Sequence, residues 1–215
     1  MTSPLALTVR LLERGEIGHA SHLLARAFAA DPFIGFFLAD ARRRRLAFSP
    51  FFRSVLHVLI ESGAVYAVER DDAVIGVAAW APPDASSPNV VTRLRASLNR
   101  AIVRGLFPRT SSRLLGGFAA LARHHPDGSH WYLAFVGIEP SVQRRGTGRA
   151  LLAPVLAQAD ETGIICYLET PFPETLEFYR RLGFELDAEL SPVVGAPPVW
   201  TMTRPPSTAA HVRVR

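Results

Sequence analysis

The sequence contains no lysine. All 24 basic residues of this 215-residue chain are arginines, against 19 aspartates and glutamates. A phosphate-binding loop of the Walker type needs the amine of a lysine, and so does any enzyme that forms a Schiff base with its substrate. The absence of lysine therefore excludes both of these classes of chemistry.

Cysteine and long apolar runs are also scarce. The single cysteine, Cys166, cannot form an intrachain disulfide, which favours a reducing compartment, and we expect the cytoplasm. The longest apolar run, from Ala73 to Ala81, is far shorter than the 18 or more residues of a membrane-spanning helix. No basic region precedes Arg10, the first charged residue, so we expect neither a secretory signal nor a membrane partner.

The composition is that of a globular protein, with 48% hydrophobic and 20% charged residues. The length favours one domain, which we place at 1–204, followed by a flexible tail at 205–215. A net charge of +5 and the run Arg42 to Arg45 raise the possibility of a nucleic-acid partner. No aromatic residues interleave with that run for base stacking, so we expect it to form a solvated helix face and to bind no nucleic acid. We expect the protein to be a monomer or a homodimer.

Apolar periodicity predicts helices that alternate with strands. The pair 64–69 and 73–80 is typical of a hairpin, whereas the 25-residue crossover between 131–138 and 164–170 implies a parallel pair of strands. The predicted fold class is therefore α/β. We expect helices over 16–29, 41–61 with a break at Ser49-Pro50, 90–123 with an interruption near Phe107-Pro108, 148–162 and 175–182, and strands over 8–12, 64–69, 73–80, 131–138, 164–170, 184–190 and 199–203.

Residues 136–152, VGIEPSVQRRGTGRALL, form a loop between a strand and a helix. The first turn of a helix has unpaired N–H groups and the positive end of the helix dipole, which favour a bound phosphate. Gly146 and Gly148 let the backbone approach such a group closely. A plain strand-to-helix turn is the alternative. A dinucleotide fingerprint fits less well, because Leu151 stands where that motif has a third small residue.

The stretch Gln143-Arg144-Arg145-Gly146-Thr147-Gly148 resembles the Q/R-x-x-G-x-G/A motif of the Gcn5-related N-acetyltransferase (GNAT) superfamily. The stretches HWYLAFVGIEPSVQRRGTG, YLETPFPETLEFYRRLGFE and VWTMTRPP are similar to those of its puromycin N-acetyltransferase group. The resemblance covers about 8–204 and fails through about 84–120. It implies a mixed, mostly antiparallel sheet with one splayed parallel pair and helices on both faces.

The resemblance also implies a cofactor site. Acetyl-CoA would be the co-substrate, with its pyrophosphate on the glycine loop and its thioester on the strand before it. The residues that would bind it are Val136, Gly137, Ile138, Gln143, Arg144, Arg145, Gly146, Thr147, Gly148, Arg149 and Tyr179.

Direct transfer of the acetyl group to an amine needs a base and benefits from an acid that protonates the leaving thiolate. By the resemblance, Glu169 is the base, directly or through a water, and Tyr179 is the acid; a structural carboxylate and a core tyrosine are the alternatives. A backbone N–H near Val136 would hold the oxyanion. Thr175 and Pro171 depart from the group's usual asparagine and serine, close to where the acceptor or the pantetheine arm would pass.

The expected function is acetyl transfer to the primary amine of a small molecule, such as a puromycin-like aminonucleoside. A non-catalytic acyl-CoA sensor and an enzyme acting on a peptide or protein amine are the alternatives. Other candidate residues carry weaker signals. No metal site is expected at the histidines, because no carboxylate or thiolate joins them at ligand spacing: His19, His22, His124, His125 and His130. The acceptor pocket is an alternative place for His130. Cys166 is expected to be a small buried residue and not a nucleophile. The aromatic residues are at least as consistent with a core as with a site: Phe33, Phe36, Phe37, Trp80 and Trp131.

Overall fold

The computed structural model describes residues 7–62, 64–83 and 110–207. Helices and strands alternate along them much as the apolar periodicity predicts. In chain order the main elements are β1 (Thr8–Leu11), α1 (Ile17–Ala27), α2 (Pro32–Phe37), α3 (Ala41–Leu59), β2 (Val65–Arg70), β3 (Ala73–Ala81), α5 (Ser111–Ala122), β4 (Trp131–Ile138), α6 (Thr147–Thr162), β5 (Cys166–Thr170), α7 (Leu176–Arg180), β6 (Glu185–Leu190) and β7 (Val199–Arg204).

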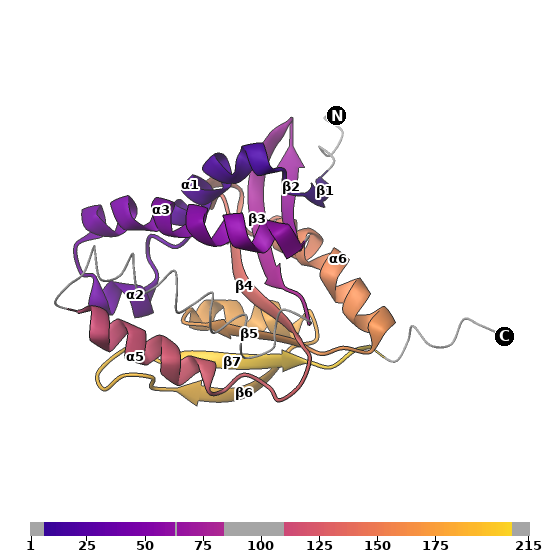
Figure 1. Cartoon of the computed structure of the whole chain (residues 1–215). Helices are drawn as coiled ribbons and strands as arrows, with labels where there is room; N and C mark the ends of the chain where they lie inside the picture. The colour runs from indigo at the N-terminus through magenta and orange to yellow at the C-terminus, as the bar shows by residue number, and fades with distance from the viewer. Residues whose placement is uncertain (1–6, 63, 84–109, 208–215) are drawn as a thin grey trace.

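The strands form one seven-stranded sheet in the order β1-β2-β3-β4-β5-β7-β6. All neighbouring strands run antiparallel except β4 and β5, which are parallel and are joined through α6. This pair is short, because only Trp131 to Leu133 of β4 pair with Cys166 to Leu168 of β5. Beyond Leu133 the two strands diverge, and Figure 1 shows β1 to β3 running in a different direction from β5 to β7. The expected sheet with a splayed parallel pair is confirmed.

Helices cover both faces of this sheet, and two apolar clusters fix which helix lies on which face (Figure 1). On one face, α1 and α3 pack on residues such as Val77 and Tyr132. On the other, α6 and α7 pack on residues such as Leu133 and Leu168. A third, smaller cluster joins α2 and α5 to Val199 of β7. Because Val199 and Met202 of β7 belong to different clusters, the side chains of that strand alternate between the two faces.

Helix α3 runs unbroken through Pro50, so the predicted break at Ser49-Pro50 is wrong. A proline inside a helix leaves the carbonyl four residues earlier, here that of Leu46, without its N–H donor. Pro50 and Leu46 are both exposed, so water can hydrate that carbonyl. The opposite, apolar face of the helix stays packed, with Phe48, Phe52 and Leu56 in the core.

The segment between the first two predicted helices, where the sequence predicted no helix, forms the short helix α2. Asp31 caps it, because its carboxylate accepts a hydrogen bond of 2.7 Å from the backbone N–H of Ile34. Pro32 stands at the first helical position, where a missing N–H costs nothing. The Asp31-Pro32 pair therefore starts a helix as well as ending the one before it.

The helix predicted over 90–123 is confirmed for α5, while 90–109 lies outside the described residues. Among the described residues, no helix is both long and apolar enough to span a membrane. The domain boundaries at 1–204 and 205–215, the cytoplasmic location and the monomer or homodimer stay predictions.

Candidate active site

Strand β4 carries a bulge beside the point where it leaves β5. On its β3 side, Phe135 pairs with Ala79 and Leu133 pairs with Trp80. Ala134 is therefore an extra residue of β4 that pairs with no residue of β3. A bulge of this kind bends a strand and increases its twist. Together with the end of the β5 pairing at Leu133, it leaves the β5-facing backbone groups of the last residues of β4 without a strand partner. The sheet therefore opens into a wedge there.

The glycine loop lies between β4 and α6, and its backbone is shaped for an anion. Gly146 is the N-cap residue of α6 and has a φ of 79°, in the left-handed region that favours glycine. No side chain caps this end of the sixteen-residue helix. Gln143 fixes the loop against β4, because its side-chain amide donates a hydrogen bond of 3.0 Å to the carbonyl of Ile138. The N–H groups of the first turn of α6 are therefore left without a side-chain acceptor.

Thr147, the first residue of α6, is 1% exposed, and its hydroxyl has no hydrogen-bond partner. A buried hydroxyl without a partner costs roughly 1 to 3 kcal/mol. Arg144, Arg145 and Arg149 are exposed around the same loop. An unsatisfied hydroxyl, free N–H groups and three guanidinium groups fit the phosphates of a cofactor such as acetyl-CoA.

Two glycines of the predicted cofactor site serve packing. A Cβ at Gly148 would come within 3.1 Å of the ring of Phe178, so this glycine lets α7 lie close to the start of α6. A Cβ at Gly137 would come within 2.8 Å of Leu24, on α1. Gly137 therefore allows α1 to lie directly against β4, and it offers a ligand only its backbone.

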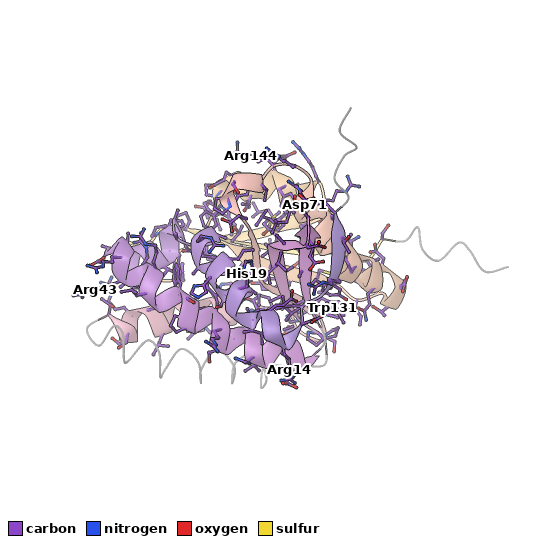
Figure 2. All side chains as sticks on the ribbon, turned by 90° about the horizontal axis from the view of Figure 1, so that it is seen from above. Arg14, His19, Arg43, Asp71, Trp131 and Arg144 are labelled. Atoms are coloured by element: carbon purple, nitrogen blue, oxygen red, sulfur yellow. The ribbon has the colours of Figure 1, made fainter. Side chains whose placement is uncertain are left out.

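The basic run at the start of α3 is separate from the arginines of the loop. Figure 2 shows Arg43 at one end of the molecule and Arg144 on another side of it. Arg42, Arg43 and Arg45 are exposed, as expected for a solvated helix face. Arg44 instead turns back, and its guanidinium donates a hydrogen bond of 2.6 Å to the carbonyl of Leu38.

Tyr179 of α7 lies on the α6 face of the sheet. Its ring is 6% exposed and meets the rings of Phe178 and Phe184 at centroid distances of 5.1 and 5.8 Å. Burial raises the pKa of the Tyr179 phenol well above its ordinary value. No group among the described residues makes a hydrogen bond with its hydroxyl, so the phenol keeps its proton and can donate it to a ligand.

Glu169 of β5 lies on the opposite face. The face follows from alternation, because Leu168 belongs to the α6 cluster and Tyr167 to the α1 and α3 cluster. The hydroxyls of Tyr132 and Tyr167 donate hydrogen bonds of 3.2 and 3.4 Å to its two carboxylate oxygens. The Glu169 side chain is 9% exposed. Glu169 and Tyr179 therefore lie on opposite faces of the sheet, and Glu169 belongs to the strand that borders the wedge.

Two histidines extend this cluster on the Glu169 face. Nε2 of His125 is 3.5 Å from Oε1 of Glu169, and Nδ1 of the same ring is 3.2 Å from Nε2 of His130. Nδ1 of His130 donates a hydrogen bond of 3.0 Å to the carbonyl of Gly128. Burial lowers the pKa of His130. The sequence analysis expected no metal site at these histidines and gave the acceptor pocket as an alternative place for His130, but it assigned no role to His125.

Partly exposed aromatic rings lie on the same face. The ring of Phe135, on β4, meets those of Phe28 and Phe51 at 6.0 Å each and that of Phe52 at 5.1 Å. Phe52 is buried, whereas the other three are partly exposed. Phe135 of this aromatic cluster belongs to β4, the strand that also carries Tyr132, the partner of Glu169.

The remaining candidates belong to the core. Trp80 and Trp131 are buried and pack edge to face, and Phe33 and Phe37 are buried with α5. Cys166 is fully buried, and burial raises the pKa of its thiol to about 12, so it is a small apolar residue and not a nucleophile. Across 7–62, 64–83 and 110–207, no three His, Cys, Asp or Glu side chains are grouped so as to hold a metal ion.

Comparison with known proteins places the chain among acetyltransferases. Residues 24–184 match the model of the Acetyltransferase (GNAT) family. The structure is similar to that of a histone acetyltransferase HPA2 and related acetyltransferase from Corynebacterium glutamicum (TM-score 0.64, 23% identity, 94% of this chain and 98% of that one). It is also similar to the Drosophila melanogaster polyamine N acetyltransferase that forms N acetylagmatine (0.59, 15%, 93% and 100%). Salmonella typhimurium yncA with its cofactor acetyl-CoA is a third such structure (0.58, 15%, 95% and 96%).

Proposed function

The chain belongs to the acetyltransferase (GNAT) family and is an N-acetyltransferase with acetyl-CoA as co-substrate, and from this premise we propose that its acceptor is the primary amine of a small molecule. One observation carries the proposal. A carboxylate at the wedge between β4 and β5, that of Glu169, and a protonated phenol, that of Tyr179, lie on opposite faces of the sheet. An amine can thus approach from one face while the thiol leaves on the other.

The glycine loop would hold the pyrophosphate. The N–H groups of Gly146, Thr147 and Gly148 and the Thr147 hydroxyl would donate hydrogen bonds to it, and Gln143 would keep the loop in place. Arg144, Arg145 and Arg149 would add charge-assisted contacts from the surface. The backbone of Val136, Gly137 and Ile138, which has no partner from β5, would hold the acyl-bearing arm.

The acceptor arrives as an ammonium group, which must lose a proton before its nitrogen can attack. Glu169 would accept that proton, directly or through one water. The Tyr132 and Tyr167 hydroxyls hold its carboxylate in place. Acetyl-CoA supplies the acetyl group as a thioester. Tyr179 would then donate its phenolic proton to the departing sulfur, which leaves faster as a thiol than as a thiolate. The attacking nitrogen loses its second proton to solvent as the amide forms, and Tyr179 takes a proton from solvent before the next cycle.

The aromatic cluster favours an acceptor with an aromatic body. Phe28, Phe51 and Phe135 present partly exposed rings on the Glu169 face, and such rings gain from stacking against another ring. A puromycin-like aminonucleoside, whose amine lies next to an aromatic side chain, has this chemistry. The resemblance of the HWYLAFVGIEP and LET segments to the puromycin N-acetyltransferase group supports the same class.

A panel of acceptors tests the proposal through the release of free CoA thiol from acetyl-CoA. The panel contains puromycin, 2-phenylethylamine, spermidine and a short peptide with a free N-terminus. We expect turnover of the aromatic amines, with kcat/KM at least tenfold above that for spermidine. Turnover of the peptide alone would instead establish a protein or peptide acceptor. Tight binding of acetyl-CoA without turnover of any amine would indicate an acyl-CoA sensor.

A further inference from the structure

His125 lies between the proposed base and a second, buried histidine. It comes from the segment between α5 and β4, and its side chain is 12% exposed. Its ring centroid is 4.6 Å from that of Tyr132 and 4.6 Å from that of Tyr167. The titratable groups in contact with it include Tyr132, Tyr167, His130 and Glu169. A histidine enclosed in this way is held in one orientation.

The hydrogen bonds determine which ring nitrogens carry protons. A carbonyl cannot donate, so Nδ1 of His130 carries the proton in its contact with Gly128. Burial lowers the pKa of His130 and so favours its neutral form, in which Nε2 of the same ring is an acceptor. The partner of that nitrogen is Nδ1 of His125, which must carry a proton. The remaining nitrogen of His125, Nε2, is left with its lone pair toward Glu169.

A lone pair that faces a carboxylate is a site for one proton. With that proton in place, either an imidazolium donates to the carboxylate or a carboxylic acid donates to the imidazole, and both forms satisfy the 3.5 Å contact. Without it, Nε2 of His125 and Oε1 of Glu169 are two acceptors that face one another. The pair is therefore arranged to take up a single proton.

We propose that His125 and Glu169 together form the proton acceptor of the reaction, with His130 as the residue that positions His125. The inference rests on the proposed function. The N–H bond of the substrate ammonium breaks, its electron pair stays on the amine nitrogen, and the proton passes through the Glu169 carboxylate to Nε2 of His125. The charge of the pair rises by one unit as that of the substrate falls by one. The proton returns to solvent after the product leaves.

The surroundings of His125 suit the charged form that this step produces. Glu169 pairs with the imidazolium directly, and His130 accepts from its other nitrogen. The rings of Tyr132 and Tyr167, whose centroids lie 4.6 Å from that of His125 at tilts of 55° and 52°, add polarisable surroundings for the cation. A proton held there is kept away from the amine during the attack.

The first test is the pH profile of kcat/KM for the amine between pH 5 and 9. We expect the wild-type profile to have an acid limb, and His125→Gln to lose at least tenfold at pH 7 together with that limb. His130→Gln should lose activity by a smaller factor and keep the limb. His124→Gln is the matched control, because His124 is an exposed neighbour that contacts the carbonyl of Ala120. An unchanged profile in His125→Gln would overturn the inference.

The second test does not depend on turnover. Nitrogen NMR of the histidine rings in the whole protein at pH 8 reports which nitrogen carries the proton. We expect Nδ1 to be protonated in both His125 and His130. Protonation of His125 at Nε2 would overturn the proton-acceptor arrangement even in an active enzyme. If no amine is turned over but both rings are protonated at Nδ1, the proposed function fails and the arrangement of the pair stands.

Discussion

At the scale of single residues, two buried polar groups work against stability and indicate different things. The Thr147 hydroxyl lies unpaired at the start of α6, where a ligand could satisfy it. The Asp31 carboxyl, 6% exposed, caps α2 but lies among apolar side chains, and burial raises its pKa to about 6. The first has a functional explanation in the proposed cofactor site. The second is a local structural cost with a measurable pH dependence.

Asp31→Asn should stabilise the protein at neutral pH. The folded-state pKa of about 6 lies above the value of 3.8 for an unburied carboxyl, so ionisation of Asp31 disfavours folding. Its cost is absent at low pH and is complete above about pH 6, where it reaches roughly 3 kcal/mol. Asparagine can still accept from the N–H of Ile34 without a charge. The free energy of unfolding in urea, measured at pH 4.5 and 7.5, should favour the variant at the higher pH.

Asp40→Asn is the matched control for this experiment. Asp40 caps α3 from the surface, and hydrogen bonds from the N–H groups of Arg43 and Arg42 lower the pKa of its carboxyl. Its contribution to stability is therefore present at neutral pH and is lost as the pH falls. The variant should be less stable than the wild type at pH 7.5, the opposite sign to Asp31→Asn. A stability difference for Asp31→Asn that does not vary with pH would contradict the burial argument.

At the scale of elements, sequence patterns predicted the helices and strands that a short stretch of residues specifies by itself. The hairpin of β2 and β3, strand β4 and helix α6 were predicted because apolar periodicity and turn residues specify them within a short stretch. Helix α2 was missed because Asp31-Pro32 ends one helix and starts the next. The break at Pro50 was wrong because packing of the apolar face of α3 outweighs one lost hydrogen bond on its exposed face.

The site was predicted less completely than the elements, because some of its contacts join residues that are far apart in the chain. Gln143 to Arg149 form a contiguous motif, and Glu169 and Tyr179 lie in segments that resemble a known group. Their roles stay predictions. The His125 contacts with Glu169 and Tyr167 join residues far apart in the chain. They follow only from the pairing of β4 with β5, which places Tyr132 beside Tyr167.

The loop and helix α6 act as one binding element in this account, and Thr147→Val tests it. Valine keeps the shape of the buried side chain and removes the unpaired hydroxyl, so we expect the melting temperature to stay equal or rise. The affinity for CoA should fall about tenfold, the equivalent of one lost hydrogen bond to a charged group. Calorimetry of CoA binding measures the effect.

Thr162→Val provides the comparison at the other end of the same helix. Thr162 is exposed, and its hydroxyl donates to the carbonyl of Gln158. This variant should leave the affinity for CoA unchanged. Equal CoA affinities for the wild type and Thr147→Val would mean that the hydroxyl does not contact the cofactor.

At the scale of the whole molecule, the sheet separates the two proposed ligand sites. The loop and α6 lie with Tyr179 on one face, and Glu169 lies with the aromatic cluster on the other. Phe51→Leu should therefore raise KM for an aromatic amine severalfold and leave KM for acetyl-CoA unchanged. Arg145→Gln should raise KM for acetyl-CoA about fivefold through the loss of a charged contact, and leave the amine KM unchanged.

Because the two positions do not touch, the effects should add in the double variant. Steady-state kinetics of the two single variants and the double variant, with each substrate varied in turn, provide the measurement. An Arg145→Gln effect on the amine KM as large as that on the acetyl-CoA KM would argue against two separate faces.

In the proposed reaction, Tyr179 is the acid that protonates the leaving thiol during acetyl transfer. The most direct measurement is the amine-dependent release of CoA thiol by the wild type and by Tyr179→Phe, with melting temperatures taken alongside. Phenylalanine keeps the packing against Phe178 and Phe184 and removes only the hydroxyl. We expect kcat to fall at least tenfold, with CoA affinity and melting temperature close to those of the wild type. A Tyr179→Phe variant that releases thiol at the wild-type rate would contradict the account.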